Sequence, residues 1–157
     1  MSDEFVQSYV SCYIILRHDD KVAFVLRSNT GWMDGHYGVA PSGRVEKGEP
    51  VLQAAIREAK EEVGITVRPG DLQHRTTCFS YNAESGIVWT NICFEATRWE
   101  GEVVNAEPHV HGSLDWFDVD DLPENVVPSH RFIVENALAG NSYCEYGWDI
   151  EETDQKL

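Results

Sequence analysis

The chain has 157 residues, of which 42% are apolar and 11% aromatic, enough for a single domain with one sizeable hydrophobic core. Its 12 basic and 27 acidic residues give a net charge of −15. This balance argues against a surface for duplex DNA or long RNA, because such a surface needs a basic footprint. The sequence has no apolar run of about 18 residues, and its acidic start lacks the pattern of a secretory signal. We therefore predict no membrane span and a cytoplasmic location.

Two strands open the chain. Residues 9–17 and 22–27 are rich in β-branched and aromatic residues, a composition typical of β-strands. A turn at 19–21 joins them, so we expect a central hairpin. Residues 28–50 contain several Gly, Asn and Pro residues and are predicted to form a loop.

A helix is predicted over residues 51–63. Its apolar residues recur at helical spacing: Val51, Leu52, Ala55, Ile56, Ala59 and Val63. Pro50 suits the start of a helix and Gly64 suits its C-cap. The charged residues between 57 and 62 fall outside the apolar stripe, so we expect them on a face that points at the preceding loop.

The second half of the chain predicts strands over 72–82, 87–99 and 114–117, and a loop over 100–113. A helix over 129–139 should end at Gly140. The tail from residue 141 carries Tyr143, Tyr146 and Trp148, which we expect to dock on the body or on a partner, whereas residues 151–157 should be loose. The order of elements fits a mixed β-sheet in an α/β/α sandwich, and no boundary divides residues 1–157 into domains.

The cysteines do not form a metal or disulfide pattern. Cys12, Cys78, Cys93 and Cys144 are widely separated, and none belongs to a pair with zinc spacing. We expect buried or half-buried free thiols, as intracellular proteins usually keep them.

Three glutamates of the first predicted helix stand at positions i, i+3 and i+4. Glu58, Glu61 and Glu62 should project from one face with Cβ atoms about 5–6 Å apart. Their mutual repulsion is relieved by a cation, and oxygen ligands favour a hard ion such as Mg²⁺ over Zn²⁺ or copper. A solvated helix face is the alternative. A metal site of this kind is most often used for chemistry on phosphates.

The glutamates are part of a longer pattern, GRVEKGEPVLQAAIREAKEEVGI, at residues 43–65. It matches the Nudix box, G-x5-E-x7-R-E-U-x-E-E-x-G-U, in which U is apolar. The matching residues are Gly43, Glu49, Arg57, Glu58, Ala59, Glu61, Glu62, Gly64 and Ile65. The chain therefore resembles a MutT-like Nudix hydrolase. Weaker similarity at 32–43, 98–101, 107–108 and 115–128 extends the resemblance over residues 8–139.

The resemblance implies the Nudix fold and a pyrophosphohydrolase that cleaves a nucleoside diphosphate linked to another moiety. Water attacks one phosphorus atom, and Mg²⁺, for which Mn²⁺ could substitute, neutralises the phosphates and activates the water. The implied partner is a small nucleotide-type substrate, without extended nucleic acid or membrane, and a homodimer stays open. Two alternatives remain. One is a non-catalytic nucleotide sensor, against which the intact box argues. The other is an RNA 5′-end pyrophosphohydrolase, against which the acidic composition argues.

The resemblance also assigns roles to residues of the box. Glu58 and Glu62 are the implied metal ligands, and the backbone carbonyl of Gly43 completes the metal shell. Glu61 is either a third ligand or the base that deprotonates the water. Some family members take the base from a distant loop, where Glu107 is the first candidate here. The other candidates in that loop are Glu100 and Glu102.

Further residues near the box have open roles. Arg57 is expected to pair with Glu49 and to orient the catalytic groups. Many family members have Gly-Gly where this chain has Ser42-Gly43, and serine tolerates a positive φ poorly, so we expect a slightly different loop and a less firmly implied carbonyl ligand. Roles in the site stay open, beside purely structural ones, for Arg27, Arg44, His109 and His111, and for Trp32, Tyr37 and Trp89 as stacking partners of a base.

Overall fold

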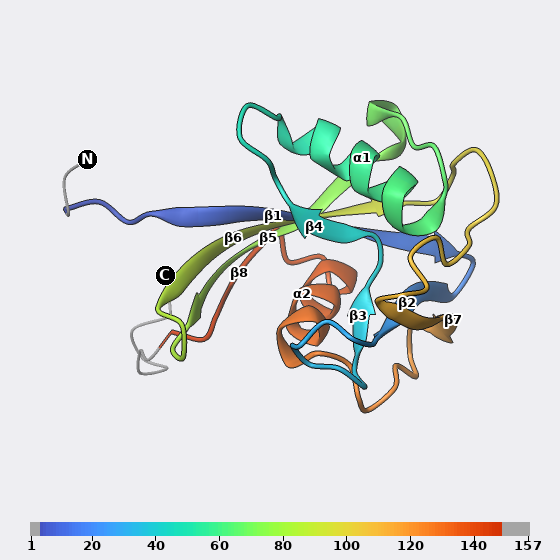
Figure 1. The fold of residues 1–157 in the computed structure, drawn as a ribbon. Coiled ribbons are helices and arrows are strands. Elements are labelled where there is room, and N and C mark those ends of the chain that lie inside the picture. Colours follow the sequence, from blue (N-terminus) through green and yellow to red (C-terminus); the bar gives the residue numbers. More distant parts are fainter. Residues whose placement is uncertain (1–3, 149–157) are drawn as a thin grey trace.

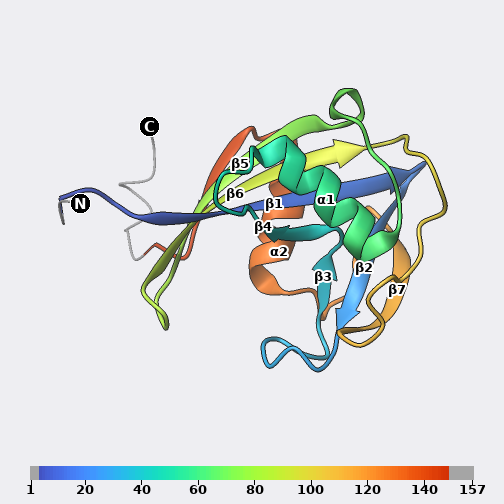
Figure 2. The ribbon, with the colours of Figure 1, turned by 45° about the horizontal axis from the view of Figure 1, so that its top comes forward.

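The structure, a computed structural model, describes residues 4–148, so the prediction for residues 151–157 lies outside it. Its strands are β1 (Ser8–His18), β2 (Lys21–Arg27), β3 (Tyr37–Val39), β4 (Ser42–Arg44), β5 (Gln73–Asn82), β6 (Ile87–Ala96), β7 (His111–Asp118) and β8 (Tyr143–Tyr146). Its helices are α1 (Val51–Val63), α2 (Pro128–Leu138) and the short 3-10 helix η1 (Pro69–Asp71). The two α-helices cover opposite faces of a mixed sheet (Figures 1 and 2). This arrangement confirms the predicted α/β/α sandwich.

Strand β1 connects the two halves of the sheet. The strand order is β3-β2-β1-β6-β5-β8, with β4 paired to β1 and β7 paired to β2. β1 runs parallel to β6 from Ser8 to Leu16, and its middle pairs with β4 on the other edge. It pairs with β2 only at Arg17 and His18. The predicted hairpin therefore exists only at its turn. Beyond the turn β1 pairs with β4 and β6, and β2 pairs with β3 and β7.

The side chains of β1 alternate between two apolar cores. Cys12, Ile14 and Leu16 pack in the core under α1, whereas Ile15 packs in the core under α2. This alternation is the period-two pattern of a strand buried on both faces. In the first core α1 presents mainly alanines to the sheet, whose small side chains let the helix lie close to β1 and β4.

Helix α1 has the predicted bounds. It follows Pro50, which is the N-cap rather than the first helical residue, and it ends at Gly64, whose φ of 73° is the left-handed conformation that glycine adopts most readily. One expectation about its faces was wrong. Glu62 is buried with Ala55, Ala59 and Val63, because it lies on the edge of the apolar stripe and not outside it. This burial positions one carboxylate against the sheet.

The predicted loop at 28–50 was too long. It contains β3 and β4, strands of three residues that pair with β2 and β1. Neither Ser42 nor Gly43 has a positive φ, so backbone strain at serine gives no reason for a different loop shape here. Two further elements, η1 and β8, were not predicted. The remaining differences are at the ends of elements: β6 stops at Ala96, β7 begins at His111, and α2 begins and ends one residue earlier than predicted.

The aromatic tail docks on the body, as predicted. β8 pairs in parallel with β5, and Trp148 stacks on Phe79 and Tyr81. All four cysteines are free and buried, which confirms that prediction. Within residues 4–148, no helix is long and apolar enough to cross a membrane.

Candidate active site

The first part of the candidate site is the contact between β4 and α1. Glu58 lies so close to Gly43 that a Cβ atom on residue 43 would overlap its carboxylate. Glycine thus leaves room for the Glu58 carboxylate, which a larger residue would displace, and it needs no special backbone angle. The close approach places a carboxylate beside the backbone of Gly43, as the resemblance implies for a metal shell.

Glu62 is the most buried carboxylate of the box. Its side chain is on the inner face of α1, only 9% of the residue is exposed, and Oε2 accepts a hydrogen bond of 3.0 Å from the backbone N–H of Ser42. Burial, with the nearby charges of Glu58 and Glu107, raises the pKa of Glu62 well above its usual value. Burial also raises the pKa of Glu58. A buried and a half-buried carboxylate of like charge need a cation to stay ionised at low cost.

Arg57 organises the outer side of this cluster. Its Nε and Nη2 donate to the two carboxylate oxygens of Glu49 at 2.8 and 3.0 Å, the expected pair. Its Nη1 donates to Glu58 at 2.9 Å and to Glu61 at 3.2 Å, and Nη2 also reaches the carbonyl of Arg44 at 3.1 Å. The guanidinium therefore ties the loop before α1 to the helix and holds two of the three box glutamates.

The donor chemistry fits a hard divalent cation, although the three box glutamates do not converge. Glu58 and Glu62 offer buried oxygens, whereas Glu61 is 55% exposed on its side chain and turns to Arg57. Within the described part of the chain, no three acidic, histidine or cysteine side chains are grouped so that they could hold a metal ion as they stand. Glu58 and Glu62, the less exposed of the three, are the candidate ligands for such an ion.

The loop before β7 brings one further glutamate near the cluster. The backbone N–H groups of Val104 and Ala106 donate to the carbonyls of Val63 and Glu62, which fixes this loop at the C-terminus of α1. The charge of Glu107 contributes to the raised pKa of both Glu58 and Glu62. The other two loop candidates differ: Glu100 pairs with Arg68, and Glu102 is exposed.

A large cavity opens beside Glu62. Its volume is about 800 Å³, within the range of small-molecule sites. It lies between the α2-facing side of β1, β5 and β6 and helix α2, and Glu62, Ser42 and Gly43 line it at the α1 end. The Glu62 carboxylate is therefore adjacent to a space large enough for a nucleotide.

Two arginine–aromatic pairs line the same cavity. Arg27 lies over the ring of Trp32, 4.9 Å from its centre, and Arg44 lies 5.2 Å from the ring centre of Trp89. Within residues 4–148 neither arginine forms an ion pair. They are the cations best placed to receive phosphate oxygens. Tyr37, by contrast, donates to Asp115 and packs on Phe117, a structural position outside the cavity.

The two histidine candidates, His109 and His111, differ in their position relative to the cavity. His111 is buried, lines the cavity and is the strand partner of Arg27, and burial lowers its pKa. Its Nδ1 has no hydrogen-bond partner among the described residues. His109 is exposed on the preceding loop. The structure thus brings His111, but not His109, to the cavity.

Sequence reasoning missed the polar residues of the cavity wall. Asn91 accepts a hydrogen bond of 2.6 Å from Ser11 and donates to Ser80 at 2.9 Å, and all three line the cavity. They come from β1, β5 and β6, and only the pairing of these strands places them together. The alternation of polar and apolar residues in each strand was the available signal, but it does not say which strands are neighbours.

His130 of α2 is a second missed residue. Its ring is buried beside Tyr13, and its Nδ1 accepts a hydrogen bond of 3.0 Å from the backbone N–H of Val39. Burial, and then the charge of Arg27, lowers its pKa from 6.5 to about 3. The neutral ring with its proton on Nε2 therefore ties α2 to β3.

This histidine should make stability fall on acidification. Below pH 6.5 His130 becomes protonated in the unfolded chain, whereas in the folded protein it stays neutral down to about pH 3. The contribution of His130 to the free energy of unfolding is therefore complete above pH 6.5 and is lost progressively as the pH falls. One such proton corresponds to at most about 1.4 kcal/mol per pH unit. His130→Asn keeps an acceptor for Val39 and cannot titrate. Between pH 7 and 5, the free energy of unfolding measured with urea should fall less steeply with pH for the variant than for the wild type. Equal pH dependences of the two proteins would contradict the lowered pKa of His130.

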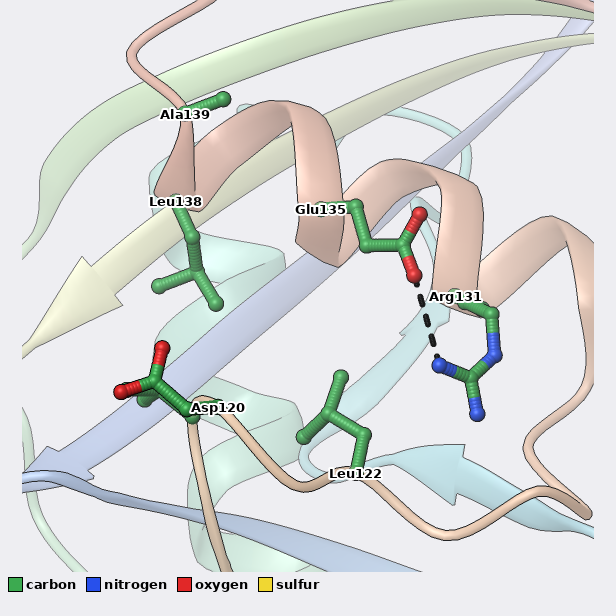
Figure 3. Close-up of a pocket in the computed structure, with 7 residues that line it drawn as sticks. Asp120, Leu122, Arg131, Glu135, Leu138 and Ala139 are labelled. Atoms are coloured by element: carbon green, nitrogen blue, oxygen red, sulfur yellow. Dashed lines mark hydrogen bonds and ion pairs between the residues drawn. The ribbon is translucent and has the colours of Figure 1, made fainter.

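A smaller hollow of about 350 Å³ lies on the outer side of α2 (Figure 3). Arg131 in its wall pairs with Glu135 at 3.3 Å and also donates to the carbonyl of Pro123. Asp120 adds a second acidic group. With its arginine already paired, this hollow does not suit an anionic substrate, so the larger cavity is the candidate site.

Comparisons with known proteins show the family and the fold of this chain. The family model of the NUDIX domain matches residues 7–137. An uncharacterised Nudix hydrolase of Bacillus subtilis, YvcI, is 31% identical over 138 residues, 87% of this chain and 82% of that protein. An 8-oxo-dGTP diphosphatase of Escherichia coli is 30% identical over 111 residues, 69% of this chain and 83% of that protein. A crystal structure of a MutT Nudix hydrolase from Burkholderia pseudomallei superposes with a TM-score of 0.74 at 29% identity, covering 83% of this chain and 98% of that one.

Proposed function

Because the chain belongs to the Nudix hydrolase family, we propose that it is a Mg²⁺-dependent pyrophosphohydrolase that cleaves a nucleotide-type small molecule by attack of water at phosphorus. The observation that carries the proposal is the position of the buried Glu62 carboxylate at the edge of a cavity that Arg27 and Arg44 also line. One member of the acidic pair, Glu62, and two arginines for phosphates line the same cavity. The four free cysteines are in keeping with the reducing cytoplasm.

In this proposal the residues of the box have different roles in catalysis. Glu58 and Glu62 would hold a divalent cation, with the carbonyl of Gly43. Such a cation would supply neutralisation of phosphate oxygens and a lower pKa for the attacking water. Glu61 or Glu107 accepts the proton of that water. Arg57 keeps Glu58 and Glu61 in place through its hydrogen bonds, and is thus a positioning residue.

The cavity binds the rest of the substrate. Arg27 and Arg44 contact phosphate oxygens, and the exposed Trp32 or the partly buried Trp89 stacks on the base. Fixing the scissile bond beside the carboxylates supplies much of the catalysis in phosphoryl transfer. Mn²⁺ should substitute for Mg²⁺, because both accept oxygen ligands.

A substrate panel tests the proposal. It contains nucleoside triphosphates including 8-oxo-dGTP, dinucleoside polyphosphates and nucleotide sugars, each with Mg²⁺, with Mn²⁺ and with chelator. We expect metal-dependent release of phosphate or pyrophosphate from at least one small nucleotide, and no release with chelator.

Other outcomes favour the alternatives. Faster reaction with a triphosphorylated oligonucleotide than with free nucleotides would assign RNA 5′ ends instead. Tight nucleotide binding, measured by calorimetry, without product from any substrate would assign a sensor. Turnover undiminished by chelator would contradict the role given to the metal.

A further inference from the structure

The segment of residues 143–148, which we call the C-terminal segment, lies beyond the part of the chain that matches the NUDIX domain. It is nevertheless part of the sheet. β8 pairs in parallel with β5 from Thr77 to Ser80, and Figure 1 shows it beside β5 on the side where α2 lies.

Trp148 fastens the segment to β5. Its ring stacks on Phe79 and Tyr81, with ring centres 5.1 and 5.3 Å away and interplanar angles of 22° and 23°. Its Nε1–H donates to the carbonyl of Phe79 at 2.9 Å. A stacked ring and a hydrogen bond from one side chain fix the end of the segment.

Gly147 lets the chain approach β5 closely. Its φ of 82° is in the left-handed region, and a Cβ atom on it would overlap the carbonyl of Tyr81. Only glycine meets both conditions. The turn it allows keeps the neighbouring Tyr146 against the body of the protein.

Tyr146 and Gly147 form part of the cavity wall. The ring of Tyr146 packs on Phe132 of α2, with ring centres 5.0 Å apart, and its strand partner Ser80 lines the same cavity. The segment therefore bridges the sheet and α2. Glu62 lines the cavity from α1, which lies on the opposite face of the sheet from α2 (Figure 1).

We propose that the C-terminal segment is the wall that limits the size of the nucleoside end of the substrate, and that Tyr146 is its specificity-determining residue. This rests on the proposed function, which assigns the cation to Glu62 and the phosphates to Arg27 and Arg44 and so leaves the rest of the cavity, with Tyr146 and Gly147 in its wall, to the base. A base that enters the cavity then contacts the Tyr146 ring. This contact excludes bulky substituents on the outer edge of the base.

The test compares two substrates that differ only in bulk on the base. They are the best nucleotide of the panel and its analogue with a benzyl group on the exocyclic position of the base. Tyr146→Ala should raise the kcat/KM ratio of analogue to parent by about tenfold or more, mainly through a lower KM for the analogue. Tyr146→Phe keeps the ring and should keep the wild-type ratio.

Tyr143→Ala is the matched control, because Tyr143 is on the same strand but exposed and outside the cavity wall. A folded Tyr146→Ala variant with the wild-type ratio would overturn the proposal. If that variant does not fold, hydrogen exchange of the backbone amides of residues 141–148 in the wild type tests the proposal instead. Slower exchange with the corresponding nucleoside monophosphate supports the proposal, and unchanged exchange overturns it. A wild type that cleaves nothing in the panel refutes the proposed hydrolase instead, and the exchange experiment still tests the wall.

Discussion

Glu62→Gln should lower the turnover number by about three orders of magnitude, equivalent to about 4 kcal/mol of transition-state stabilisation. The substitution keeps the shape of the side chain and an oxygen that can accept the hydrogen bond from Ser42. It removes the charge with which Glu62 and Glu58 would together hold a divalent cation. Turnover measured over a range of Mg²⁺ concentrations checks this, and near-native turnover at saturating Mg²⁺ would show that the site is assigned wrongly.

The same variant should fold at least as stably as the wild type without divalent metal. Glu62 is buried and its raised pKa reports that ionisation is costly there, so a neutral amide removes that cost. Unfolding by urea in the presence of a chelator measures the difference in the free energy of unfolding between Glu62→Gln and the wild type. Glu124→Gln, at an exposed position, is the control and should change neither turnover nor stability. A Glu62→Gln protein that loses turnover because it is unfolded would leave no support for a metal ligand.

Gly43→Ala should lower turnover by about two orders of magnitude, because the new methyl group must displace the Glu58 carboxylate. The backbone at residue 43 is not left-handed, so alanine itself causes no backbone strain and the fold should survive. The expected signature is a higher Mg²⁺ requirement together with lower turnover. Thermal unfolding with and without Mg²⁺ gives an independent measurement of the weakened site.

Two variants make this test specific. Gly70→Ala is the matched control, since a Cβ atom there meets nothing within 4 Å and the φ of Gly70 is not left-handed. Glu58→Asp shortens the displaced side chain, so Gly43→Ala should cost much less in the Glu58→Asp background than alone. Fully additive effects of the two substitutions would mean that the methyl group acts by some route other than Glu58.

The helix that carries the chemistry was predictable because its signals are local. An apolar repeat, a proline and a glycine, all between Pro50 and Gly64, fix the bounds of α1. The helical spacing of Glu58, Glu61 and Glu62 likewise indicated one acidic cluster. What the spacing could not reveal is the unequal burial of its members, since Glu62 faces β4 whereas Glu61 turns to Arg57.

The parts that were missed depend on pairing between distant segments. β3 and β4 are three residues long, too short for an apolar pattern, and are strands only because β2 and β1 offer free edges. The cavity combines Ser11, Ser80 and Asn91 with His130, residues from three strands and a helix. Local propensity does not determine which strands lie side by side, so neither this wall nor its closure by Tyr146 could be predicted.

The parallel pairing of β1 with β6 has a consequence for the speed of folding. The hydrogen bond between Ser8 and Val88 joins residues 80 positions apart, and β1 makes pairings of this kind from Ser8 to Leu16. Chains dominated by such non-local contacts close costly loops before they gain packing, and mixed or all-β domains of this type fold on timescales of about milliseconds to seconds. Because β1 contributes to both apolar cores, neither core can be completed until this long loop has closed, so the two halves of the protein should gain structure together in a single cooperative step.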